Sequence, residues 1–204
     1  MPHEKSIPAL QASRKALARY FTQPVVGLLA KTPVTPNALT VCSLLVTVGA
    51  AVLVATEHFV AAALVLLFAS FFDILDGALA RATNRVTRFG AALDSTLDRL
   101  AEAVILIGML VVYARAQALT EVVLVGVALV SSFLVSYVRA RAEGLGVECQ
   151  VGIFTRSERI VVLVLGLLFA QFHYVLLAAL VIISFFSVIT VGQRLYEVWK
   201  RTKS

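Results

Sequence analysis

Apolar residues gather in six long runs that are separated by short polar segments. The runs lie near residues 35–55, 60–81, 91–114, 120–142, 157–172 and 174–195. A helix needs about 20 apolar residues to cross about 30 Å of hydrocarbon, so the pattern predicts six transmembrane helices, of which the fifth is the shortest. The fold class expected from this pattern is an all-α integral membrane protein.

The segment before the first run has a different character. Residues 1–31 are polar, basic and weakly amphipathic, and they lack the short apolar core of a cleavable signal peptide. We expect this segment to form an interfacial amphipathic helix along the membrane surface, and residues 32–204 to form a six-helix bundle. The chain from 1 to 204 would then be a single membrane domain.

Composition supports a membrane protein. Hydrophobic residues make up 60% of the 204 residues and the mean hydropathy is +0.92, which exceeds what a soluble domain of this length shows. No nucleic-acid motif accompanies the net charge of +6, so we assign that charge to membrane topology and to anionic headgroups. The isolated Cys42 and Cys149 are expected to be free thiols.

Lysine and arginine lie almost entirely in every second segment between the apolar runs. Of the 18 in the chain, five precede the first run, four lie at 81–99, four at 139–159 and four after 193, which leaves only Arg115 for the opposite side. Because cytoplasmic loops carry the basic residues, both termini and the polar end of the second run are expected to face the cytoplasm. We therefore place the protein in the plasma membrane, as a multi-pass protein.

Four aspartates stand at the ends of apolar runs. One such side chain at the centre of a membrane helix costs about 3 kcal/mol on insertion scales, so four of them require a compensating cation. Asp73 and Asp76 share one helical face, and Asp94 and Asp98 share another. If residues 82–89 fold back, the four carboxylates converge on an oxygen-only site that suits Mg²⁺ or Mn²⁺.

Small residues and an arginine accompany these carboxylates. Gly77 and Ala80 lie on the face of Asp76 and leave room for a bulky ligand beside the backbone, and Arg81 adds a fixed positive charge. A divalent metal, small residues and an arginine together indicate a binding site for a diphosphate.

The stretch DILDGALARATNRVTRFGAALDSTLD resembles the signature of the CDP-alcohol phosphotransferase family, DxxDGxxAR, eight residues, then GxxxDxxxD. All eight fixed positions match: Asp73, Asp76, Gly77, Ala80, Arg81, Gly90, Asp94 and Asp98. The resemblance implies a membrane transferase that uses a CDP-linked lipid such as CDP-diacylglycerol. It also implies that Asp73, Asp76 and Asp94 hold one or two divalent ions, that Asp98 is the general base, and that a homodimer is usual.

A segment with two prolines precedes the first run, with the sequence TPVTPNALT at 32–40. Its prolines stop one element, and threonine or asparagine can cap the next helix. The pattern PNxLT is common in the family near the nucleotide. By this resemblance Asn37 and Thr40 also contact the cytidine diphosphate, together with Asp76, Gly77, Ala80 and Arg81.

Basic residues in the last third of the chain suggest the acceptor. Arg139, Arg141, Arg156 and Arg159 lie near the ends of two adjacent runs, and Arg194 lies near the end of the last. These segments resemble the subgroup of the family that makes phosphatidylinositol phosphate or archaetidylinositol phosphate. In that subgroup, residues matching Arg139, Arg159 and Arg194 hold the phosphate of inositol 1-phosphate. Position 139 is often lysine in bacterial members, so arginine there keeps the charge but alters the geometry.

The function expected is transfer of a phosphatidyl group from CDP-diacylglycerol to a hydroxyl of myo-inositol 1-phosphate, with release of CMP. An alternative within the family is a phosphatidylglycerol-phosphate synthase, because glycerol 3-phosphate also carries a phosphate. An alternative of another class is a non-enzymatic transporter of divalent cations or protons. The outer halves of the runs, at 41–55 and 61–72, offer few polar groups for a conduction path.

Overall fold

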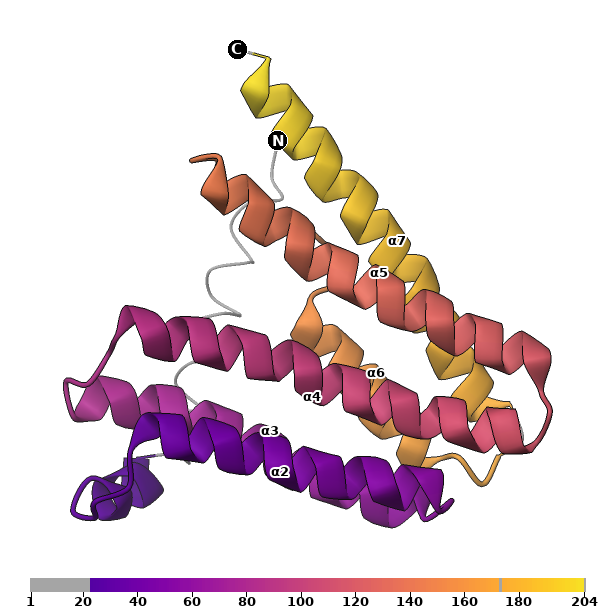
Figure 1. Cartoon of the computed structure of the whole chain (residues 1–204), viewed down its shortest axis with the longest axis horizontal. Coiled ribbons are helices and arrows are strands. Elements are labelled where there is room, and N and C mark those ends of the chain that lie inside the picture. Colours follow the sequence, from indigo (N-terminus) through magenta and orange to yellow (C-terminus); the bar gives the residue numbers. More distant parts are fainter. Residues whose placement is uncertain (1–22, 173, 204) are drawn as a thin grey trace, which may run out of the picture. The chain divides into compact units, whose positions relative to one another are not determined.

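Six named helices follow one another along the chain in this computed structural model, which describes residues 23–172 and 174–203 (Figure 1). They are α2 (Pro36–Ala55), α3 (Phe59–Ala82), α4 (Arg88–Arg115), α5 (Leu119–Gly144), α6 (Arg156–Leu168) and α7 (Val175–Thr202). Each apolar run coincides with one of these helices to within a few residues, and residues 23–29 are helical as well. The all-α class is therefore confirmed for the described residues. The expected surface helix lies mostly in residues 1–22, outside the described part.

Four of the described helices, α2, α3, α5 and α7, are long and apolar enough to cross a membrane. Length and composition therefore support four of the six expected spans. Helix α6 has 13 residues, which at 1.5 Å per residue gives about 20 Å, short of the hydrocarbon thickness. Helix α4 has 28 residues, but it carries Asp94 and Asp98 in its first half and Glu102 at its centre.

Four connections between helices use the same backbone device. The second residue after the helix end adopts a left-handed conformation, and the backbone N–H of the next residue donates to a carbonyl five positions back, at 2.8–3.0 Å. The four residues are Glu57, Asn84, Gln117 and Gly146, with φ of 65°, 56°, 54° and 74°. The first three give short reversals between successive helices. Residues 82–89 therefore fold back, as the sequence predicted.

A threonine directly precedes each of three helices and takes part in capping it. Thr35 accepts a hydrogen bond from the Ala38 N–H at 3.2 Å at the start of α2, and Thr87 accepts one from the Gly90 N–H at 2.9 Å at the start of α4. Before α6, the Glu158 carboxylate accepts from the Thr155 N–H at 2.8 Å, which completes a capping box. The prolines and threonines before α2 thus act as the sequence predicted.

The described residues form two compact units. The first contains residues 23–45 together with 68–98, and its apolar core is built around Val26, Leu39, Leu75 and Leu79. This unit holds the start of α2, the end of α3, the start of α4 and the connection at 83–87. It therefore contains the whole aspartate motif.

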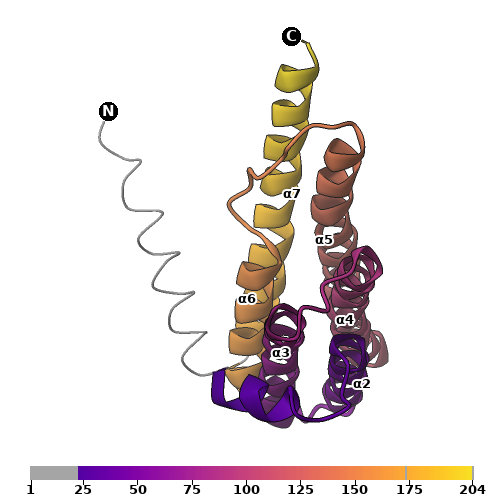
Figure 2. The ribbon, with the colours of Figure 1, turned by 90° about the vertical axis from the view of Figure 1, so that its left-hand side faces the viewer.

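The second unit contains residues 46–67 and the described residues from 99 onward. Within it, α7 packs against both α5 and α6 (Figures 1 and 2). Two glycines permit close approach: a Cβ at Gly108 would lie 2.7 Å from the Ala51 carbonyl oxygen, and one at Gly166 would lie 2.8 Å from the Ala179 Cβ. The arginines of the last third of the chain all belong to this unit.

Candidate active site

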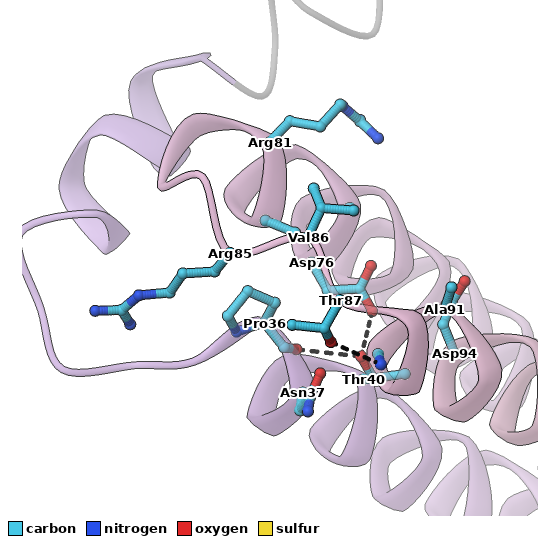
Figure 3. A pocket seen from close by; sticks show the side chains of 13 residues that line it. Pro36, Asn37, Thr40, Asp76, Arg81, Arg85, Val86, Thr87, Ala91 and Asp94 are labelled. Carbon is cyan, nitrogen blue, oxygen red and sulfur yellow. Dashed lines mark hydrogen bonds between the residues drawn. The ribbon is translucent and has the colours of Figure 1, made fainter.

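An open cavity of about 280 Å³ lies in the first unit, between the start of α2, the end of α3 and the start of α4 (Figure 3). Thirteen residues line it: Pro36, Asn37, Thr40, Asp76, Gly77, Ala80, Arg81, Arg85, Val86, Thr87, Gly90, Ala91 and Asp94. Both halves of the aspartate motif contribute to this one cavity. All six residues that the sequence assigned to the cytidine diphosphate are among them.

Hydroxyl groups of α2 hold two of the carboxylates of α3. Asp76 is buried, with 5% of its surface exposed, and it accepts a hydrogen bond from the Thr40 hydroxyl at 2.7 Å. The Ser43 hydroxyl lies within hydrogen-bond reach of Asp73 Oδ1 and lies 3.0 Å from the Ala69 carbonyl oxygen. Because the two pairs have the same three-residue spacing on antiparallel segments, the two helices are in matching register here.

The charge around Asp76 is negative. The charges of both Asp94 and Asp73 act on the Asp76 carboxylate. In the described part of the chain, no arginine or lysine forms an ion pair with Asp76. A buried carboxylate with negative neighbours and one hydroxyl donor is costly unless a cation joins it. Its oxygen-only surroundings suit a hard divalent ion such as Mg²⁺ or Mn²⁺.

The other two aspartates are placed differently. Asp73 and Asp98 are half-buried and do not line the cavity. Among the described residues, no three histidine, cysteine, aspartate or glutamate side chains gather closely enough to hold a metal ion. The structure therefore shows two aspartates, Asp76 and Asp94, on the cavity walls and a third held by Ser43, rather than four carboxylates at one point.

The two motif glycines each admit a neighbouring side chain. A Cβ on Gly77 would lie 3.3 Å from Arg81 Nη1, so the guanidinium of Arg81 folds back over this glycine. A Cβ on Gly90 would lie 3.1 Å from Asn37 Oδ1, so this glycine lets α4 approach the start of α2. The sequence assigned the space at Gly77 to a ligand, whereas the structure fills part of it with Arg81.

The structure adds residues that the sequence analysis missed. Arg85, Val86 and Thr87 come from the connection between the motif halves and line the cavity, and Figure 3 shows Arg85 directed away from the two aspartates. Ser43 was also missed, although its three-residue spacing from Thr40 was a usable signal. A hydroxyl pair at helical spacing in an apolar run can face an acidic pair of the same spacing.

Three arginines that the sequence linked to an acceptor phosphate lie near one another in the second unit, since the charges of Arg139 and Arg159 act on Arg194. Arg139 is exposed and pairs with Glu143 at 2.9 Å. Arg194 is buried: its Nε donates to the Val151 carbonyl at 2.9 Å, and its Nη1 donates to the Val135 carbonyl.

Arg159 is the most enclosed of the three, with 1% of its surface exposed. Its Nε lies 2.5 Å from Glu102 Oε1, and its Nη2 lies 2.8 Å from Glu102 Oε2. Glu102 was not singled out in the sequence. It lies four residues beyond Asp98 in α4, where the spacing of the acidic stripe continues.

The sequence profile of the CDP-alcohol phosphatidyltransferase family matches residues 33–190. This range includes most of the chain and both halves of the motif that line the cavity. The chain belongs to this family. Membership makes the protein an enzyme, and it sets aside the alternative of a non-enzymatic transporter.

Two similar proteins, one of them in two crystal structures, are informative about the subgroup. An archaetidylinositol phosphate synthase of Methanothermobacter thermautotrophicus is 37% identical over 191 residues, which cover 93% of this chain and 94% of the relative. The crystal structure of Mycobacterium tuberculosis phosphatidylinositol phosphate synthase with CDP-DAG bound has a TM-score of 0.82 and 32% identity, covering 87% and 93% of the two chains. The same enzyme with manganese and citrate gives 0.81 and 34%, covering 87% and 88%.

Proposed function

We propose that this enzyme transfers a phosphatidyl group from CDP-diacylglycerol to myo-inositol 1-phosphate and releases CMP. The observation that carries the proposal is the single cavity into which both motif halves contribute Asp76 and Asp94. Similarity to the synthases named above supports the donor, because one of them was crystallised with CDP-DAG. The similarity also supports inositol phosphate as the acceptor, because the two relatives are an archaetidylinositol phosphate synthase and a phosphatidylinositol phosphate synthase.

The donor's diphosphate would lie in the cavity beside Gly77, Ala80 and Arg81. Asp76 and Asp94, with Asp73 beside them, would hold one or two divalent ions there, and manganese in a similar enzyme supports such use. When bound, the metal neutralises the charge that develops as CMP departs. Thr40 keeps the Asp76 carboxylate in place from α2, and Asn37 lies where the nucleotide can contact it.

Asp98 is proposed as the general base. It would accept the proton of the acceptor hydroxyl as that oxygen forms a bond to the phosphorus of the lipid phosphate and the bond to the CMP oxygen breaks. Asp98 would then also lie close to the metal site. The phosphate of the acceptor is assigned to Arg139, Arg159 and Arg194, three cations of the second unit whose charges interact.

We further propose six membrane crossings with the site and both termini on the cytoplasmic side of the plasma membrane, and a homodimer as the assembly. The placement of 17 lysines and arginines supports this topology. Helix α4 would cross with its acidic first half near the membrane surface, and α6 would complete the bundle despite its length. The nucleotide part of the donor and the acceptor would then both reach the site from the cytoplasm, whereas the lipid tails of the donor would stay in the membrane.

The test is release of CMP by the purified protein in detergent with CDP-diacylglycerol and Mg²⁺. Inositol 1-phosphate, free inositol, glycerol 3-phosphate and serine are supplied in parallel, with Asp98→Asn as the inactive control. We expect CMP release with inositol 1-phosphate and with none of the other three acceptors. Release with glycerol 3-phosphate would instead favour a phosphatidylglycerol-phosphate synthase, and free inositol as the best acceptor would remove the role of the arginines.

A further inference from the structure

The pairing of Arg159 with Glu102 uses only one edge of the guanidinium group. Both carboxylate oxygens are engaged, one by Nε and one by Nη2. This is a bidentate, charge-assisted arrangement, which fixes the plane of the guanidinium as well as its position. The side chains of both residues are at most 4% exposed, so water does not compete for the contact.

The third nitrogen of the Arg159 guanidinium, Nη1, is not engaged by Glu102. Nη1 is buried and has no hydrogen-bond partner among the described residues, although it carries two N–H donors. A buried donor without a partner costs about 1–3 kcal/mol, and more when it is charged. Such a group within a cluster of cations indicates a place for an anionic ligand.

The surroundings make Glu102 the group that sets the direction of Nη1. Arg194 is held by two backbone carbonyls and Arg139 by Glu143, so each of the three cations has its own support. Within the described residues, Glu102 is the side chain that pairs with the Arg159 guanidinium. Moving the carboxylate would therefore move the nitrogen that a ligand must reach.

We infer that Glu102 is a positioning residue for the acceptor phosphate: its carboxylate clamps Nε and Nη2 of Arg159 so that Nη1 is presented to the phosphate. This inference deepens the proposed function and rests on it for the identity of the acceptor. Glu102 touches no reacting atom and acts only through Arg159. Its contribution is geometric, and this separates it from a residue that merely offsets a buried charge.

Two substitutions distinguish a positioning role from charge compensation, because the two roles predict different effects of each substitution on acceptor binding. Glu102→Asp keeps the charge and shortens the side chain by one methylene, whereas Glu102→Gln keeps the length and removes the charge. If Glu102 positions Arg159, both variants raise the KM for inositol 1-phosphate by about tenfold and leave the KM for CDP-diacylglycerol within about twofold. If Glu102 only offsets charge, the Asp variant behaves like the unmodified enzyme and the Gln variant binds the phosphate more tightly.

The matched control is Glu197→Asp. Glu197 pairs with Arg201 in α7 at 2.5 Å, but Arg201 is half exposed. This variant shortens a glutamate that also contacts an arginine Nε, and both KM values should stay unchanged. If Glu102→Gln fails to fold because it strands a buried charge, the Asp variant alone still decides the question.

A second measurement is independent of turnover. The thermal midpoint of each protein is recorded with and without excess inorganic phosphate. The unmodified protein should be stabilised by phosphate, and Glu102→Asp should lose most of that increase while keeping a midpoint close to normal without phosphate.

The two measurements separate failure of this inference from failure of the proposed function. If the unmodified enzyme turns over inositol 1-phosphate and folded Glu102→Asp has the same acceptor KM, the positioning role is wrong and the function stands. If CMP is released with none of the acceptors but the phosphate effect depends on Glu102, the function is wrong and the anion site stands. Absence of any phosphate effect in the unmodified protein, with acceptor KM insensitive to Glu102, overturns the anion site.

Discussion

Asp76 is the carboxylate that depends most on a cation, because it is buried and the charges of two other aspartates act on it. Asp76→Asn should lower the rate of CMP release by about 100-fold or more, since a metal supplies several kcal/mol of charge stabilisation. Without metal, the same variant should have a thermal midpoint equal to or higher than that of the unmodified protein, because a repulsive charge is removed. Mg²⁺ should raise the midpoint of the unmodified protein but have little effect on the variant.

Glu121→Gln is a suitable control for this experiment. Glu121 lies in the first turn of α5, outside the cavity, and its replacement should leave both the rate and the Mg²⁺ effect unchanged. A Mg²⁺-induced rise in Asp76→Asn as large as in the unmodified protein would contradict a metal site at Asp76.

Thr40 provides a second test at the scale of one residue. Thr40→Val keeps the shape of the side chain but removes the hydroxyl that donates to Asp76 at 2.7 Å. We expect kcat/KM for the donor to fall about tenfold, as is typical of losing a hydrogen bond to a charged group. Thr40→Ser should restore most of the activity because it restores the donor. Equal activity of the Val and Ser variants would show that only the volume at position 40 matters.

The residues of the cavity were predictable to the extent that helical spacing governs them. Asp76, Gly77 and Ala80 lie on one face of α3 and Arg81 follows directly, so the sequence alone places them together. Ser43 and Glu102 were missed because each acquires its role from a partner in another helix, and the partner is fixed only by tertiary packing. The sequence also gave no sign that Arg159 would be buried and clamped by a carboxylate.

At the scale of elements, the connection from α5 to α6 is fastened to α7 by side chains of α7. Gln193 accepts from the Ile153 N–H and Thr190 from the Phe154 N–H, both at 3.2 Å, while Arg194 donates to Val151. Gly152 lies at the centre of this contact with φ of 136°, and a Cβ there would lie 2.7 Å from Thr190 Cγ2 and 3.2 Å from Arg194 Nε. The glycine therefore permits both the backbone conformation and the approach of the loop.

Gly152→Ala should lower the thermal midpoint and raise the KM for the phosphorylated acceptor several-fold, because the new methyl group displaces Thr190 and Arg194. Gly146→Ala is the matched control: its φ of 74° is also left-handed, but no atom of the described residues lies within 4 Å of the added Cβ. It should cost stability through backbone strain alone and leave the acceptor KM unchanged. Equal acceptor KM in the two variants would contradict a link between this loop and Arg194.

Element positions were more predictable than element roles. All six apolar runs coincide with helices, since a long apolar run bounded by polar segments reports a local preference. Whether a helix crosses the membrane depends also on its final length and charge. Helix α6 ends at Leu168 and continues as a turn, and this local ending was not visible in the apolar composition of 157–172.

At the scale of the whole molecule, the asymmetry of basic residues predicts an orientation that two cysteine substitutions can test. Glu148 follows α5 and Ala116 precedes it, and both are exposed. In a Cys42→Ser background, which removes the exposed native thiol, a membrane-impermeant maleimide should label Glu148→Cys in inside-out vesicles only. It should label Ala116→Cys in right-side-out vesicles only, because positive-inside placement puts the loop at Arg115 outside.

The second native thiol, Cys149, is buried and should contribute little background, which the Cys42→Ser protein alone verifies. Because α5 is among the four helices that can cross a membrane, opposite labelling of its two ends establishes one crossing and its direction in a single experiment. The direction decides more than topology. A phosphorylated polyol does not pass a bilayer without a carrier, so an acceptor cluster at the Glu148 end of α5 can work only if that end faces the cytoplasm. Labelling of Glu148→Cys from outside would therefore contradict both the orientation and the use of a cytoplasmic acceptor.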